Sequence, residues 1–127
     1  KLREAGIRVS LFIGPDKVQV AVAEAMGAPV VELHTGKYVE LVFHGDKAGA
    51  AEELKRLHEA AEHGAAKGIE IHVGHGLTYD TVRPVAAIPE VRELNIGHFI
   101  MGEALFVGLD AAVKRMRQEI DAARGHA

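Results

Sequence analysis

The chain has 127 residues, of which 48% are hydrophobic and 26% are charged. This length and composition suit one domain with one packed core, and they exclude a disordered chain. The net charge of −3 argues against a general nucleic-acid binder, and the absence of cysteine excludes a disulfide framework and thiolate chemistry. No apolar run approaches the roughly 18 residues of a membrane-spanning helix. These features fit a cytoplasmic protein with no membrane partner.

The chain begins with a pattern typical of a helix end, followed by a strand and a helix. Gly6 closes the opening KLREAG segment, so we expect these residues to be the last turn of a helix whose earlier part lies outside the sequence. Residues 8–13 alternate as a strand does, and Gly14-Pro15-Asp16 then starts a helix that Gly27 ends. The expected buried stripe of that helix is Val18, Val22, Ala25 and Met26.

The middle of the chain predicts two further strands, separated by a loop and a long helix. The strands are residues 30–35 and 69–73. Residues 36–45 show no clear period and are expected to form a loop, either over a site or on the surface. Asp46 is expected to cap a helix that continues to Lys67. The expected apolar stripe is Leu54, Leu57, Ala61 and Ala65, and the expected solvated face is Glu52, Glu53, Lys55, Arg56 and Glu59.

The last part of the chain predicts a helix over residues 78–88 and a strand over 94–100. A small turn is expected over 102–104 and an amphipathic helix over 110–124, with Gly125-His126-Ala127 as a tail. The order is therefore strand then helix, four times. Alternating units of this kind predict a parallel sheet with right-handed crossovers.

The alternation within the strands predicts that the two faces of the sheet differ. The residues expected to face the covering helices are Val9, Leu11, Val31, Leu33, Ile69, Ile71, Leu94 and Ile96. The other face then carries Ser10, Phe12, Glu32, His34, Glu70, His72 and Asn95. A doubly wound sheet is normally apolar on both faces, whereas a polar inner face suits a barrel. Four such units make half of a TIM (β/α)8 barrel, and alone they leave two open sheet edges.

Three strand ends carry a titratable residue next to glycine. The segment IEIHVGHGLTY ends in Gly74-His75-Gly76, LNIGHFI carries Gly97-His98, and VVELHTG carries Glu32 and His34. Glycine lets the backbone bend and approach a ligand closely. Because α/β folds build their sites at the carboxyl ends of parallel strands, the sequence predicts one site at this end of the sheet.

The motifs VSLFIG, VELHTG, GHGLTYDTV, AAIPEV and LNIGHFIMGEAL resemble the C-terminal half of the pyridoxine 5′-phosphate synthase family. The match runs from Gly6 to about Arg124, so residues 1–127 are expected to be the C-terminal half of a single TIM-barrel domain whose N-terminal half is absent. The resemblance implies vitamin B6 biosynthesis from two phosphorylated small molecules, with no metal and no organic cofactor. It also implies a homo-oligomer.

The resemblance assigns roles to particular residues. It makes His75 the proton donor and Glu32 the stabiliser of the transition state. It also implies that the aminoketone phosphate substrate is bound by Gly76, Gly97 and His98. The family's general bases and the arginines that hold the other substrate lie in the N-terminal half, so these 127 residues alone are expected to be inactive.

Two other functions fit parts of the pattern. A half-barrel that pairs with a second copy could bind phosphate esters without catalysis. A metal-dependent hydrolase barrel would use the histidines near the strand ends, which are His34, His72, His75 and His98.

Structural roles are the expected alternative for several polar residues. Glu32 could form an interior ion pair with Arg8, and Thr78 and Tyr79 could serve a helix start. His34 and His72 are expected to be interior hydrogen-bonding residues. The histidines expected on the surface are His44, His58, His63 and His126.

Overall fold

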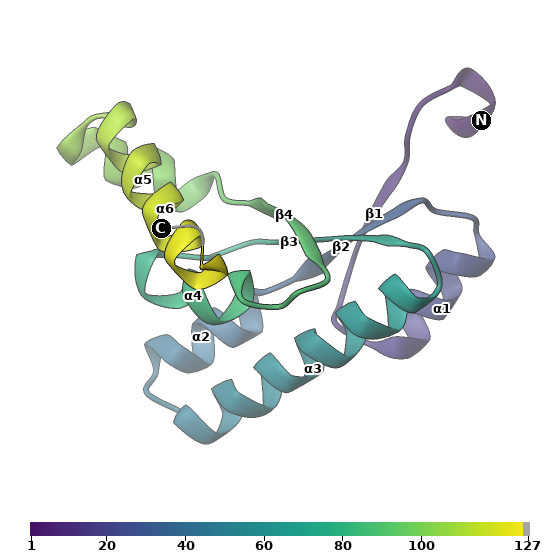
Figure 1. Cartoon of the computed structure of the whole chain (residues 1–127), viewed down its shortest axis with the longest axis horizontal. Coiled ribbons are helices and arrows are strands. Elements are labelled where there is room, and N and C mark those ends of the chain that lie inside the picture. Colours follow the sequence, from purple (N-terminus) through teal and green to yellow (C-terminus); the bar gives the residue numbers. More distant parts are fainter. Residues whose placement is uncertain (126–127) are drawn as a thin grey trace.

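Four parallel strands lie side by side in the order of the chain, β1-β2-β3-β4, in the computed structural model, which describes residues 1–125 (Figure 1). The strands are β1 (Ser10–Ile13), β2 (Val30–His34), β3 (Glu70–Gly74) and β4 (Val91–Asn95). The helices are α1 (Lys17–Ala25), α2 (Gly36–Phe43), α3 (Lys47–Ala66), α4 (Tyr79–Ala86), α5 (His98–Val107) and α6 (Leu109–Arg124), after a single 3-10 turn at Arg3–Ala5. Within the described residues, no helix combines the length and apolarity needed to cross a membrane.

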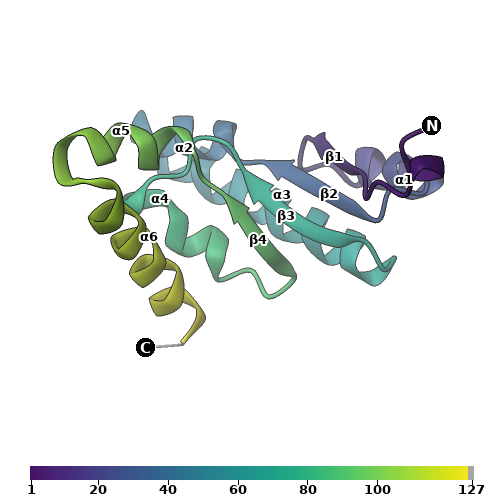
Figure 2. The ribbon, with the colours of Figure 1, turned by 90° about the horizontal axis from the view of Figure 1, so that it is seen from above.

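Helices cover one face of the sheet and leave the other open, as the alternation in the strands predicts. Helices α1, α3 and α4 pack against the strands from one side, and Figure 2 looks onto the uncovered side. The strand register aligns Val31 with Ile71 and Leu33 with Val73 on the covered face. It aligns Phe12, Glu32, His72 and Glu93 in one row on the open face. The predicted half of a TIM barrel is therefore confirmed in its strand order, direction and polarity.

The core lies between the sheet and its helices and consists mainly of branched aliphatic side chains. Its largest fully buried members include Leu33, Leu57, Ile71, Leu77, Val73 and Val82. Burial of such side chains is the main favourable contribution to folding, at roughly 25 cal/mol per Å² of apolar surface. Because the core is on one side only, the polar row on the open face is free to form a site.

Helix α1 buries different residues from those predicted. Val20 and Ala23 face the core, whereas Val18, Val22 and Met26 are 70%, 54% and 64% exposed. Both sets have helical spacing, so sequence alone could not decide which one faces the sheet. The exposed set forms an apolar stripe along one side of α1.

The segment predicted as a loop over residues 36–45 is the helix α2. Tyr38 is buried in the core, and Val39, Leu41 and Val42 pack against it. These contacts hold a helix too short to be stable alone, which is why propensity did not reveal it. The predicted capping of the next helix by Asp46 is confirmed, since its carboxylate accepts from the Gly49 N–H at 2.9 Å.

The strand predicted over residues 94–100 is displaced, because β4 covers Val91–Asn95. Val91 is fully buried and pairs with Ile71. The apolar residues that follow belong to α5, a ten-residue helix in place of the predicted small turn at 102–104. A short apolar run fits a strand and a helix turn equally well, and here Ile96, in the connection to α5, and Phe99, in its first turn, are partly buried against the core. His126 and Ala127 lie outside the described residues.

Glu53 is buried, although its neighbours predicted a solvated position. Its side chain is 4% exposed, and its Oε2 atom lies 2.8 Å from Arg56 Nη1 and 3.4 Å from Lys37 Nζ. The carboxylate therefore links α3 to the first turn of α2. Charged groups are tolerated in such places only when they are paired.

We expect Glu53→Gln to lower the free energy of unfolding by about 2 kcal/mol. This is less than the ~3–5 kcal/mol of a fully buried pair, because Lys37 and Arg56 keep contact with water. Urea unfolding would measure the change. Glu52→Gln, at an exposed position of the same helix, is the matched control and should stay within about 0.5 kcal/mol of the parent. Equal stability of the two variants would contradict the prediction.

Candidate active site

A cavity of about 640 Å³ opens at the carboxyl ends of the strands on the open side of the sheet. Its lining includes every site residue predicted from the sequence: Glu32, His75, Gly76, Gly97 and His98. Phe12 and Asn95 also contribute to the walls. The four strand ends thus meet at a single concave site.

His75 sits at the end of β3 in an unusual backbone conformation. Its φ is 80°, and among the described residues it alone is a non-glycine residue with positive φ. Gly76 follows with φ of 87°. The conformation turns the chain sharply at the strand end, so the His75 ring lies over the end of β2. There it stacks on the ring of His34, with centroids 4.5 Å apart and planes 29° apart.

His34 is a fixed, uncharged neighbour of His75. Its Nδ1 atom accepts a hydrogen bond from the Gly36 N–H at 3.0 Å, which places its own ring proton on Nε2. Burial lowers the pKa of His34, the nearby His75 lowers it further, and Glu32 opposes the shift. At neutral pH the ring is therefore neutral. The predicted interior hydrogen-bonding role of His34 is confirmed.

Glu32 reaches across β3 to Asn95 on β4. The Asn95 side chain donates from Nδ2 to Glu32 Oε2 at 2.8 Å. The carboxylate passes over Gly74, where a Cβ atom would come within 2.3 Å of Glu32 Oε1. The suggested ion pair between Glu32 and Arg8 is wrong, because Arg8 bonds Glu70 instead. Asn95 is a site residue that the sequence did not reveal, although it was placed on the correct face, whereas Gly74 belongs to the strand end that the sequence singled out.

Gly97 and His98 form the start of α5. Gly97 is the N-cap residue, and no side chain bonds the first amide groups of this ten-residue helix. Such a helix start offers free N–H groups and the positive end of the helix dipole. His98 is exposed at this point and faces the cavity that also holds His75.

Thr78 and Tyr79 belong to the structure around the site. Thr78 is the N-cap of α4 and forms a capping box with Thr81. The Tyr79 ring is buried, its hydroxyl donates to the Ala112 carbonyl at 3.2 Å, and the Arg115 guanidinium lies 4.1 Å from its centroid. These contacts join α4 to α6, so both residues serve the helix start and its packing.

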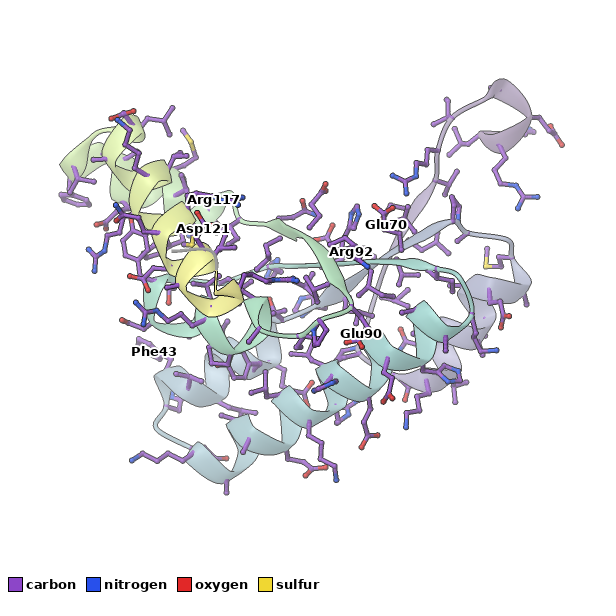
Figure 3. All side chains as sticks on the ribbon, viewed as in Figure 1. Phe43, Glu70, Glu90, Arg92, Arg117 and Asp121 are labelled. Carbon is purple, nitrogen blue, oxygen red and sulfur yellow. The ribbon has the colours of Figure 1, made fainter. Side chains whose placement is uncertain are left out.

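A charged network lies on the open face, outside the residues that line the cavity, and consists of Arg8, Glu70, His72 and Glu93. His72 contacts Glu70 at 2.7 Å through Nε2 and Glu93 at 3.2 Å through Nδ1. Glu70, which projects from the uncovered face (Figure 3), also bonds Arg8 at 2.7 Å. The predicted interior role of His72 is confirmed. Within residues 1–125, no three His, Asp or Glu side chains are grouped so as to hold a metal ion.

We expect this network to make stability depend on pH. Hydrogen bonds from His72 and then from Arg8 hold the pKa of Glu70 below its ordinary value of 4.5. Its charged form is thus favoured by folding, so its stabilisation is present above that value and lost as the pH falls through the lowered pKa. Urea unfolding at several pH values should show Glu70→Gln less stable than the parent at pH 7, with a difference that shrinks in acid. Glu62→Gln, on the exposed face of α3, is the control, and a constant difference for Glu70→Gln would contradict the prediction.

These features define half of a TIM barrel with a single site at the carboxyl ends of its strands. The chain belongs to the family described as pyridoxal phosphate biosynthesis protein PdxJ, whose family model matches residues 1–122.

Curated relatives agree with this assignment. The chain is 59% identical over 124 residues to a protein of Rhodospirillum rubrum, covering 96% of this chain and 48% of that one. It is 56% identical over 123 residues to a protein of Jannaschia sp. (97% and 50%) and 55% identical over 124 residues to one of Zymomonas mobilis (98% and 47%). All three are called pyridoxine 5′-phosphate synthase. The chain spans about half the length of the curated relatives it matches.

Proposed function

We propose that this chain is the C-terminal half of a pyridoxine 5′-phosphate synthase. The complete enzyme would condense 1-deoxy-D-xylulose 5-phosphate with 3-amino-2-oxopropyl phosphate to pyridoxine 5′-phosphate, inorganic phosphate and water. The observation that carries the proposal is the cavity that gathers Glu32, His75, Gly76, Gly97 and His98. The names of the relatives support the same reaction.

His75 is proposed to donate the proton that the ring-closing sequence needs. Imine formation, loss of water and elimination of phosphate all move protons near neutral pH, where histidine serves without much tuning. The exposed His75 ring lies in the cavity, and the neutral His34 ring supports it from behind. A bound substrate can therefore reach the imidazole from the open side.

The start of α5 is proposed to bind the phosphate of the aminoketone substrate. Free amide groups at Gly97 and His98 suit an anion, and the helix dipole adds to the attraction. Gly76 also lines this cavity, and because it has no side chain a ligand can approach its backbone closely. These groups and His75 hold one substrate between the ends of β3 and β4.

Glu32 is proposed to stabilise positive charge on an imine during the reaction. The Asn95 amide donates to one of its oxygens, and the other lies close to Gly74. A fixed carboxylate needs no reorganisation when charge develops beside it. No metal and no organic cofactor is part of this proposal.

The rest of the barrel is proposed to come from an N-terminal half. Within the described residues 1–125, β1 pairs only with β2 and β4 only with β3, so both outer edges need partners. The exposed stripe of Val18, Val22 and Met26 lies beside one edge. A groove of about 400 Å³ runs between β4 and α6 at the other edge, where Arg92 and Arg117 are found (Figure 3). We propose that residues 1–127 alone are inactive.

The assembly and location follow as part of the same proposal. The complete enzyme is proposed to be a cytoplasmic homo-oligomer. The side chains of Leu105 and Phe106 on α5, which are 85% and 87% exposed, support association between copies.

The test is turnover by the complete polypeptide. It should form pyridoxine 5′-phosphate and release phosphate when both substrates are present, and residues 1–127 alone should not. A folded complete polypeptide that forms no product would contradict the proposal. Intact mass and light scattering decide the alternative: a stable pair of 13.6 kDa chains that binds phosphate esters without turnover would favour the self-pairing half-barrel.

A further inference from the structure

Thr35 makes contacts that an ordinary helix-capping threonine does not make. It follows β2 directly, is the N-cap residue of α2, and is fully buried. An N-cap threonine normally accepts from the amide groups of its own helix. Here no such bond forms. The Thr35 hydroxyl instead lies 2.7 Å from the carbonyl oxygens of both Gly74 and His75.

The convergence of two successive carbonyl groups on one hydroxyl depends on the backbone of His75. In an extended strand, neighbouring carbonyl groups point in opposite directions. The left-handed conformation of His75 turns its carbonyl to the same side as that of Gly74. The Thr35 N–H also bonds the Gly74 carbonyl, at 2.8 Å. A hydroxyl carries one proton, and the Gly74 carbonyl already accepts from the Thr35 N–H, so the hydroxyl proton is the donor that the His75 carbonyl needs.

The same turn sets the direction of the His75 ring. A left-handed residue other than glycine is strained and persists only where its surroundings hold it. With the backbone held by Thr35, the His75 ring stacks on His34, the residue immediately before Thr35, and lies in the cavity. The end of β2 therefore holds both the backbone and the ring of His75.

We propose that Thr35 is a positioning residue for His75. Through the carbonyl group of His75, its hydroxyl maintains the left-handed backbone that directs the imidazole into the cavity. The inference rests on the proposed function, which gives His75 its role as proton donor.

The first test is a mutant cycle in the complete polypeptide. Thr35→Val keeps the shape and removes the hydroxyl, and should lower kcat about tenfold or more while KM for both substrates changes less than about twofold. Thr35→Ser keeps the hydroxyl and should restore most of kcat. In a His75→Asn background, Thr35→Val should cause no further loss, because residues that act as a unit are not additive. Thr81→Val is the matched control, since it removes another buried threonine hydroxyl, from α4.

The second test observes His75 directly by NMR. The imidazole carbon–proton signal of His75, assigned by its loss in His75→Asn, should shift in Thr35→Val and stay near its original position in Thr35→Ser. If Thr35→Val fails to fold, Thr35→Cys replaces it. A thiol stands in the place of the serine hydroxyl but is a weak donor, so kcat should fall relative to Thr35→Ser.

The outcomes separate this inference from the proposed function. An unchanged His75 signal with unchanged kcat in Thr35→Val would overturn the positioning role of Thr35 alone. An equal further loss in the His75→Asn background would show that Thr35 acts on something other than His75, and would also overturn it. Normal turnover by His75→Asn would overturn the role of His75 itself.

Discussion

Replacement of His75 by asparagine is expected to lower kcat of the complete polypeptide by about a hundredfold or more, the range of general acid catalysis. Asparagine is suited to this test because it tolerates the left-handed conformation that His75 adopts, with φ of 80°. The backbone turn and its bonds to Thr35 should therefore survive, and only the ionisable ring is lost. Steady-state kinetics with both substrates would measure the change.

The control for this variant is His58→Asn, at an exposed position of α3. It should leave kcat unchanged. Circular dichroism and thermal unfolding should show that His75→Asn folds as the parent does. KM for the aminoketone should change little, since Gly97 and His98 supply the proposed phosphate contacts. A kcat within a few-fold of the parent would contradict the assigned role of His75.

Replacement of Gly74 by alanine is the second change with a large expected effect. The new Cβ atom would lie 2.3 Å from Glu32 Oε1 and 2.9 Å from the backbone oxygen of Asn95. The Glu32 side chain can rotate away, but the Asn95 backbone belongs to β4 and cannot. We therefore expect the Glu32–Asn95 hydrogen bond to break, kcat to fall about tenfold or more, and stability to fall by about 1–3 kcal/mol.

Gly102→Ala is the matched control for this change. Gly102 lies inside α5, and a Cβ atom there meets nothing within 4 Å. Alanine favours a helix over glycine by about 1 kcal/mol, so this variant should be as stable as the parent or more so. Glu32→Gln should reproduce the kinetic loss of Gly74→Ala. A Gly74→Ala protein with the kcat of the parent would show that the position of Glu32 is not critical.

Much of the fold followed from local pattern. The alternation of strands with helices predicted the parallel sheet, and the alternation of residues within the strands predicted its polar face, because both patterns are visible in short segments of the sequence. Helix α2 was missed because its contacts with the core, rather than its own sequence, hold it in place. The predictions of which side of α1 is buried and of an exposed Glu53 were wrong for a related reason. Which of two helical stripes faces inward depends on partners distant in the chain.

The residues of the candidate site likewise fall into those that a short segment predicted and those that it did not. His75, Gly97 and their neighbours stood out because a histidine beside glycine at a strand end is visible in a short segment. Asn95 and Thr35 did not stand out, since their importance arises from contacts with residues 63 and 39–40 positions away. Such contacts require the register of the sheet. The roles assigned to the site residues remain predictions until the variants are measured.

The strand order also has a consequence for how the chain is made. Within residues 1–125, each of β2, β3 and β4 pairs with the strand that precedes it in sequence. During synthesis, each unit that leaves the ribosome therefore meets its neighbour already in place, and the sheet can extend one strand at a time. Sheets built from such near neighbours pay less loop-closure entropy than those whose central strands arrive last. Strand β4 brings Asn95, and its amide completes the hydrogen bond to Glu32 only when β4 has paired with β3.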